Sequence, residues 1–225
     1  MICSDGSSKN RIGVLDLQGG VCEHLDHLER LGIAGIRVKE AADFEGIAGL
    51  ILPGGESTCL SRLMRIFDLE QVLLDAFQQG MKIWGTCAGA ILLATGVLGE
   101  KPHLGLIDLD IERNSFGSQL DSFSIEASIP EVSPDPVPLT FIRAPKIFQV
   151  GSTVRVLLRF KNYIAAAEND QVLVTVFHPE LTPCLAFHRY FALKCGISSS
   201  PSEKLLADAG HRWNSTSWTR LAPHA

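Results

Sequence analysis

Residues 81–94 read Met-Lys-Ile-Trp-Gly-Thr-Cys-Ala-Gly-Ala-Ile-Leu-Leu-Ala, and this stretch decides the fold class that we expect. Its start is typical of a buried strand, and 88–94 is apolar and helix-prone. Between them, 85–89 has the glycine–x–nucleophile–x–glycine pattern of a sharp strand–turn–helix elbow. The sequence therefore predicts one strand–helix step of an α/β domain, with the Cys87 thiol lifted out of the sheet at the turn.

The same strand-then-helix order recurs through the first half of the chain. Strands are expected at 12–17, 36–39, 50–52 and 81–84, and apolar residues at helical spacing predict helices after Gly20, at about 60–67 and at about 69–77. Units of this length predict a doubly wound, mainly parallel sheet with helices on both faces.

The second half is richer in strands, which predicts an antiparallel extension at one side of the sheet. These strands are expected at 104–111, 122–129, 139–142, 154–158, 163–167 and 172–177. Four prolines, Pro130, Pro134, Pro136 and Pro138, mark a loop. A last helix is expected at about 183–195, with Leu185, Tyr190 and Phe191 facing the core.

Length and composition predict one globular domain. The chain has 225 residues, of which 46% are hydrophobic and 20% are charged. We expect a flexible N-terminus at 1–10, the domain at 11–197, and a loosely ordered or disordered tail at 198–225. The net charge of −5 gives no reason to expect nucleic-acid binding. No stretch has the apolar length of a membrane span or a signal peptide, so we expect a cytoplasmic protein whose six cysteines are reduced.

A candidate nucleophile and base lie far apart in the sequence. The N-terminus of the helix after Cys87 favours a thiolate, although the motif alone fits a structural cysteine in a glycine-rich turn equally well. The expected strand 172–177 leads into His178-Pro179-Glu180, where residues i and i+2 point the same way. Alone, His178 and Glu180 would be read as a capping histidine and a surface glutamate. With Cys87 they predict a thiol–imidazole–carboxylate triad.

The stretch 52–58, Leu-Pro-Gly-Gly-Glu-Ser-Thr, ends another strand. Its two glycines let backbone N–H groups approach a ligand closely, as an oxyanion hole requires. Ser57 or Thr58 could equally cap the next helix, and both roles are compatible.

Two histidines on one predicted helix raise the question of a metal site. His24 and His27, with Cys22 and Glu23 beside them, have the i, i+3 spacing of metal ligands. We favour a solvated helix face, because no complete set of three or four ligands is apparent, and we expect no metal.

The three motifs, in this order, resemble the class I (triad) glutamine amidotransferases. Over about 11–197 the chain resembles more closely the glutaminase subunits of pyridoxal 5′-phosphate synthase. The matching stretches are 17–19, 53–58, 85–89, 102–106, 113–117, 121–123, 141–145 and 177–182. The stretches Arg-Asn-Ser-Phe-Gly at 113–117 and Phe-Ile-Arg-Ala-Pro at 141–145 are the most particular to this family.

The resemblance implies a cysteine-dependent glutaminase that needs no cofactor. Cys87 would attack the glutamine amide, His178 would carry the proton, and Glu180 would orient the histidine. The N–H groups of Gly55 and Ala88 would form the oxyanion hole. The matching substrate-binding positions are Gly55, Glu56, Ser57, Arg113, Ile142 and Arg143. The two arginines suit a carboxylate.

The resemblance also implies a partner. The family's glutaminase works beside a (β/α)8-barrel synthase subunit that receives the ammonia, and its activity is expected to depend on docking.

Several positions depart from the family pattern. Ser118 stands where many relatives have arginine, and Pro183-Cys184-Leu185-Ala186 replaces a more acidic stretch. Asp16, Gly20 and Ala90 stand where relatives often have alanine, alanine and methionine. Three alternatives follow: an amidotransferase of another pathway, a small cysteine hydrolase, or a non-catalytic scaffold that kept the fold.

Overall fold

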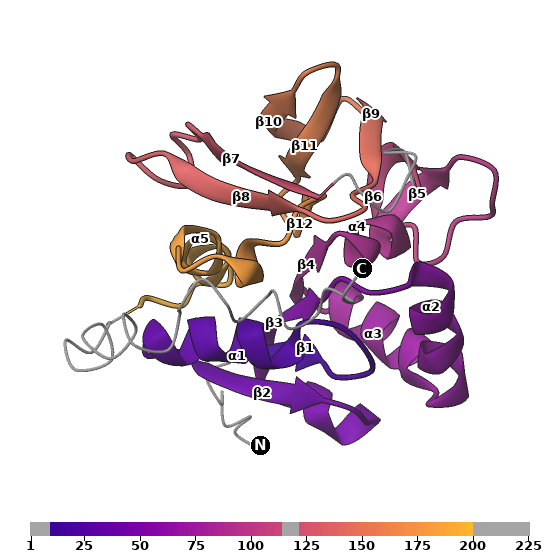
Figure 1. Ribbon diagram of the computed structural model, residues 1–225. Helices are drawn as coiled ribbons and strands as arrows, with labels where there is room; N and C mark the ends of the chain where they lie inside the picture. The colour runs from indigo at the N-terminus through magenta and orange to yellow at the C-terminus, as the bar shows by residue number, and fades with distance from the viewer. Residues whose placement is uncertain (1–9, 114–121, 200–225) are drawn as a thin grey trace, which may run out of the picture.

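The computed structural model describes residues 10–113 and 122–199 (Figure 1). The expected N-terminal flexibility before Asn10, the departure at Ser118 and the expected tail from Ser200 lie outside the described residues.

A ten-stranded mixed sheet organises the described chain. Five neighbouring strands run parallel, and the expected site lies at the edge of the sheet that their carboxyl ends form. In spatial order they are β2 (Ala34–Val38), β1 (Arg11–Leu15), β3 (Ile47–Leu52), β4 (Lys82–Thr86) and β12 (Val172–Thr175). All six residues of β3 are buried, as expected for a parallel strand covered on both faces.

The rest of the sheet is largely antiparallel, which confirms the expected extension. Beyond β12 lie β11 (Tyr163–Glu168), β9 (Lys146–Val150), β6 (Ile107–Glu112) and β5 (Ala94–Val97), with β10 (Arg155–Phe160) paired to β11. Only β5 and β6 pair in parallel here. A separate antiparallel pair contains β7 (Phe123–Ala127) and β8 (Val137–Phe141).

Helices cover the sheet in two groups (Figure 1). One contains α1 (Val21–Arg30) and α5 (Ala186–Lys194), which contact each other. The other contains α2 (Ser57–Ile66), α3 (Leu69–Gln78) and α4 (Ala88–Leu93), with α2 contacting both neighbours. Two short 3-10 helices are η1 (Ala41–Phe44) and η2 (Pro179–Leu181). The α/β, doubly wound architecture expected from the sequence is confirmed.

Helix α5 packs on the parallel strands through aromatic rings. Phe191 is fully buried, and its ring centroid lies 5.6 Å from that of Trp84 on β4. A Cβ atom added at Gly49 of β3 would lie 2.9 Å from the Phe191 ring, so the missing side chain lets the helix approach. Tyr190, expected in the core, is only partly buried and turns to Glu168 instead.

Some expectations about elements were wrong. Strands β5 and β9 were not predicted, and the helix expected to reach Ala94 ends at Leu93, where β5 begins. Pro138 lies within β8, not in a loop. A two-stranded sheet tolerates this proline because each of its strands has an edge without a partner. Within the described ranges, the helices are all too short or too polar to cross a bilayer.

The packing of α5 predicts that substitutions at two of its residues differ greatly in their effect on stability. Phe191→Ala should lower the free energy of unfolding by about 3–5 kcal/mol, because it leaves a cavity beside Trp84. Leu193→Ala on the same helix should change it by less than about 0.5 kcal/mol, because Leu193 is 58% exposed. Urea unfolding of both variants measures this, and equal losses would contradict the packing described.

Candidate active site

Four adjacent parallel strands bring the expected site residues to one edge of the sheet. Gln18 follows β1, the Pro53–Gly55 loop follows β3, Cys87 follows β4, and His178 follows β12. The carboxyl ends of parallel strands meet at this edge, which is where open α/β sheets place their ligand sites. The structure therefore gathers segments that are up to 160 residues apart in the chain.

Cys87 occupies a strained elbow. It is the single residue between β4 and α4, and its backbone angles are φ 48° and ψ −103°. Its N–H donates to the Thr175 carbonyl at 2.8 Å, which ties the elbow to β12. A non-glycine residue at positive φ is uncommon and costs about 1–3 kcal/mol, a strain found mostly at functional positions.

The two glycines of the elbow are required by close backbone contacts. A Cβ atom at Gly89 would lie 2.1 Å from the Leu52 carbonyl oxygen, and one at Gly85 would lie 2.5 Å from the Gly89 backbone. Helix α4 can therefore pack against β3 and β4 only without side chains at these positions. The glycines of the pattern seen in the sequence are therefore what permits the turn at Cys87.

His178 and Glu180 form a buried ion pair beside Cys87. The His178 Nδ1–H donates to Glu180 Oε1 at 2.8 Å, and the two side chains are 12% and 1% exposed. Burial alone would lower the pKa of His178, but the charges of Glu180 and Cys87 outweigh it and raise that pKa well above its usual value. Burial opposes ionisation of Glu180 too, yet mainly the charge of His178 lowers its pKa to about 2.

The glycine loop after β3 lies directly on this pair. A Cβ atom at Gly54 would come within 2.4 Å of His178 Cε1 and 3.4 Å of the Cys87 Cβ. Gly55, with φ 149°, lies in a region that favours glycine. The backbone of the expected oxyanion loop is thus packed against both the candidate nucleophile and the candidate base.

The cap of α2 differs from the expectation. Glu56, not Ser57 or Thr58, is the N-cap, and its carboxylate accepts from the N–H groups of Thr58 at 3.1 Å and Cys59 at 2.7 Å. Burial opposes the shift, but these N–H groups and Arg113 lower the pKa of Glu56. The Ser57 hydroxyl is buried and has no hydrogen-bond partner among the described residues.

Arg113 is held by polar partners around this cap. Its guanidinium donates to Glu56 Oε1 at 2.7 Å, to Glu100 Oε2 at 2.8 Å and to Thr58 Oγ1 at 3.0 Å. The loop expected to bind substrate and the expected arginine are therefore joined in the structure.

The other expected substrate residues follow β8. The His178 N–H donates to the Thr140 carbonyl at 2.8 Å, which places the end of β8 beside His178. Ile142 is partly buried, whereas Arg143 is exposed and has a positive φ of 45°. Ala88, expected in the oxyanion hole, begins α4 and is 1% exposed.

Sequence reasoning gave no role to Gln18, although it noted the stretch 17–19. The Gln18 Oε1 atom accepts from the Glu56 N–H at 3.2 Å, and a Cβ atom at Gly55 would lie 3.1 Å from it. Gln18 thus supports the glycine loop from β1. Its position just after a strand on the same edge was the available signal.

The solvated helix face expected at His24 and His27 was wrong. Both side chains are completely buried, together with His188 of α5. His24 Nδ1 lies 2.8 Å from His188 Nε2, and His27 Nδ1 lies 3.0 Å from His188 Nδ1. Across 10–113 and 122–199, no group of three or more histidine, cysteine or acidic side chains has the geometry to hold a metal ion.

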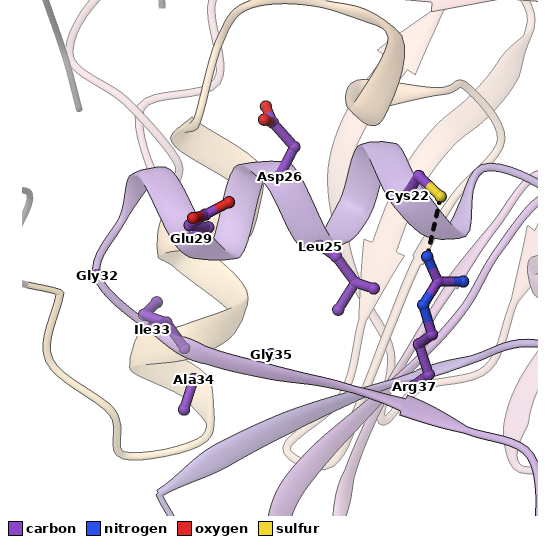
Figure 2. A pocket seen from close by; sticks show the side chains of 9 residues that line it. All are labelled: Cys22, Leu25, Asp26, Glu29, Gly32, Ile33, Ala34, Gly35 and Arg37. Atoms are coloured by element: carbon purple, nitrogen blue, oxygen red, sulfur yellow. Dashed lines mark hydrogen bonds between the residues drawn. The ribbon is translucent and has the colours of Figure 1, made fainter. Parts of the chain in front are cut away.

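A separate groove of about 690 Å³ lies between α1 and β2 (Figure 2). Cys22 and Arg37 face each other across one end, where the guanidinium donates to the sulfur at 3.1 Å. Cys87, His178 and Glu180 do not line this groove. Cys22 is one of five described cysteines, all free, as expected. Cys3 lies outside the described residues.

Known proteins resemble the chain along most of its length. Residues 14–196 match the SNO glutamine amidotransferase family. The pyridoxal 5′-phosphate synthase subunit PdxT of Syntrophus aciditrophicus (strain SB) is 75% identical over 224 residues, covering 100% of both chains. PdxT of Clostridium botulinum (strain Loch Maree / Type A3) is 48% identical over 80% of this chain and 95% of its own. A solved structure described as a glutamine amidotransferase has a TM-score of 0.78 and 39% identity, covering 83% of this chain and 99% of its own.

The buried histidines predict a loss of stability in mild acid. Burial lowers the pKa of His27 to about 3, whereas an unfolded histidine titrates near 6.5. Its contribution to stability is therefore complete above about pH 6.5 and is lost as the pH falls below it, by about 1.4 kcal/mol per pH unit. His27→Leu should lower the slope of unfolding free energy against pH by about that amount between pH 4 and 6.

Urea unfolding at a series of pH values measures this slope. Between pH 7 and 8 the variant and the wild type should have equal slopes, which serves as the internal control. Equal slopes between pH 4 and 6 would show that His27 is not held neutral by burial.

Proposed function

The chain belongs to the SNO glutamine amidotransferase family, and we propose that Cys87, His178 and Glu180 are the triad with which it hydrolyses glutamine. The observation that carries the proposal is the His178–Glu180 pair, joined at 2.8 Å and placed against a cysteine with a positive φ. A thiol nucleophile needs a neighbouring base that a third group orients, and the contacts of His178 with Cys87 and Glu180 support these roles.

The chain is a glutaminase subunit of pyridoxal 5′-phosphate synthase, in keeping with relatives that are 75% and 48% identical to it. It works with a synthase subunit. We propose in addition that this partner is a (β/α)8 barrel, that it receives the ammonia directly, and that docking activates the glutaminase. The cytoplasmic location and the absence of a cofactor stay predictions from the sequence.

In the proposed reaction the Cys87 thiolate attacks the side-chain carbonyl carbon of glutamine. The oxyanion that forms accepts hydrogen bonds from the Gly55 and Ala88 N–H groups. His178 gives its proton to the leaving ammonia, and a thioester remains on Cys87. His178 then takes a proton from water, which attacks the thioester and releases glutamate. Glu180 stabilises the imidazolium in both steps, as its effect on the pKa of His178 indicates.

For the substrate we propose the positions Gly55, Glu56, Ser57, Arg113, Ile142 and Arg143. The Ser57 hydroxyl, which has no partner among the described residues, can donate a hydrogen bond to glutamine or accept one from it. Arg113 already holds two carboxylates, so it reaches a substrate carboxylate only by exchanging a contact with Glu56 or Glu100. Arg143 is exposed, so burial does not restrict the movement of its side chain towards a substrate.

A scaffold without catalysis is the alternative from another class. It gives no reason for the strained backbone at Cys87 or for a buried ion pair, each of which costs stability. Family membership argues against an unrelated cysteine hydrolase.

The first prediction of the proposal is that the thiol of Cys87 is required. Cys87→Ser should abolish glutamate release from L-glutamine, because a hydroxyl is a far weaker nucleophile near neutral pH. Cys59→Ser is the matched control: Cys59 is exposed on α2, and this variant should retain full activity.

Both variants and the wild type are assayed with and without a pyridoxal 5′-phosphate synthase subunit. Activity that rises with the partner and vanishes only in Cys87→Ser supports the triad and the docking. No glutamate from the wild type under either condition would contradict catalysis, and equal activity without the partner would contradict activation by docking.

The second prediction concerns the contact of the glycine loop with the triad. Gly54→Ala should lower kcat/KM for glutamine about 100-fold, because the new methyl group would displace the His178 ring. Gly80→Ala is the control for general effects of this substitution. Gly80 precedes β4, at the opposite edge of the sheet, and has open space around its Cβ position, although its φ of 95° will cost some stability. Wild-type kinetics in Gly54→Ala would show that the ring does not lie against this loop.

A further inference from the structure

Three completely buried histidines stand in a row behind the proposed triad. His24 and His27 come from α1, and His188 comes from α5. His188 lies between the other two, with ring nitrogens 2.8 Å from His24 and 3.0 Å from His27. The row therefore joins the two helices that cover one side of the sheet, and none of its members is used in the proposed reaction.

One end of the row meets the triad. Glu180 accepts from His178 through Oε1, and its other oxygen, Oε2, faces His24 Nε2 at 3.6 Å. Both facing atoms are buried, and among the described residues neither has a hydrogen-bond partner. The contact is therefore slightly long for a hydrogen bond, and an approach of a few tenths of an ångström would complete it for both atoms.

The charge of Glu180 decides which nitrogen of His24 carries the hydrogen. An ionised carboxylate only accepts hydrogen bonds, so a bare nitrogen lone pair facing it would be repelled. His24 Nε2 must therefore carry a hydrogen. Burial lowers the pKa of His24, although Glu180 opposes the shift, so the ring is neutral and its Nδ1 is an acceptor.

The same reasoning fixes the tautomers of the other two rings. His24 Nδ1 accepts, so His188 Nε2 must donate to it at 2.8 Å. Burial and the neighbouring histidines lower the pKa of His188, so its Nδ1 is bare and must accept from His27 Nδ1 at 3.0 Å. The N–H groups of the row therefore all point in the same direction: from His27 to His188, from His188 to His24, and from His24 to Glu180.

The surroundings keep the row dry and neutral. The Trp84 ring lies edge-on to His24 at 5.6 Å and to His188 at 5.0 Å between ring centroids. The charged group of α1 that acts on the row is Arg30, which donates to the Pro183 carbonyl at 3.0 Å and pairs with Asp26 at 3.8 Å. At the other end it is faced by the charges of Glu180 and His178, and the backbone of Thr182 forms a hydrogen bond with His27.

We propose that His24 is a positioning residue of the triad: its Nε2–H holds the second oxygen of Glu180, and His188 and His27 hold His24 in the tautomer that this requires. This inference rests on the proposed function of Cys87, His178 and Glu180. A carboxylate held at one oxygen can rotate about its last bond, whereas one held at both keeps its plane and thereby the orientation of His178.

His24→Leu and His24→Gln test the proposal in the complex with the synthase subunit. Leucine removes the donor, whereas glutamine places an amide N–H near the position of Nε2. His24→Leu should lower kcat for glutamate release about 10- to 100-fold, the range for loss of one hydrogen bond to a charged group, with KM changed less than about twofold. His24→Gln should restore most of the lost kcat at a similar thermal stability.

Histidine tautomers in the wild-type chain give a measurement that needs no variant activity. Long-range ¹H–¹⁵N correlation spectra of ¹⁵N-histidine-labelled protein distinguish Nδ1–H from Nε2–H, and loss of signals in single His→Gln variants assigns the seven histidines. We expect Nε2–H on His24, Nε2–H on His188 and Nδ1–H on His27.

The spectra and the kinetics can each overturn the proposal. The spectra do so if His24 carries its hydrogen on Nδ1. The kinetics do so if a folded His24→Leu has the wild-type kcat, or if His24→Gln restores none of the loss. If His24→Leu does not fold, the tautomers and His24→Gln decide. An inactive wild-type complex would instead refute the proposed function, and the tautomer spectra would still report the row.

Discussion

The fold and the site share one constraint: β4 and α4 are joined through the single residue Cys87. A turn this tight leaves no room for side chains at Gly85 and Gly89, and it presses α4 against the end of β3. A side chain at either glycine would move the helix away and carry the sulfur with it. The positive φ of Cys87 is offset by the burial of all six residues of α4, so the strain persists because the surrounding packing leaves no alternative.

Four histidines lie near the buried carboxylate of Glu180 and differ in protonation state. His178 is charged, whereas His24, His27 and His188 are neutral. His178 lies 2.8 Å from Glu180 and its pKa is raised, whereas His24, at 3.6 Å, has its pKa lowered because burial outweighs the more distant charge. A single buried anion can stabilise one buried cation, and a second would leave an uncompensated charge in the interior. His24, His27 and His188 must therefore be neutral to remain buried without water behind Glu180.

Much of the first half could be predicted, since β1, β3 and β4 are largely apolar strands, each followed by a turn and a helix. The meeting of the three residues of the proposed triad could be predicted for a related reason, because their motifs follow strands whose carboxyl ends meet at one edge. Strand β5 could not, because it follows α4 with no residue between them, and Ala94-Thr95-Gly96-Val97 has no pattern typical of a strand. The burial of His24 and His27 could not either, because their partner His188 lies more than 160 residues away. Glu56 was not predicted as the N-cap of α2, because serine and threonine are preferred at that position.

The two parts of the site are built from different kinds of contact. Glu56 and Arg113 are 49% and 25% exposed, so the hydrogen bonds around the glycine loop compete with water and can be exchanged with a ligand at little cost. Glu180 is enclosed instead. A Cβ atom at Gly20, just before α1, would lie 3.1 Å from its Cγ, and His24 lies against its second oxygen. The carboxylate of the proposed triad is therefore packed within the layer of helices that stabilises the sheet. Substitutions in the packing of α1 against α5 should disturb chemistry and stability together, whereas substitutions in the loop can separate the two.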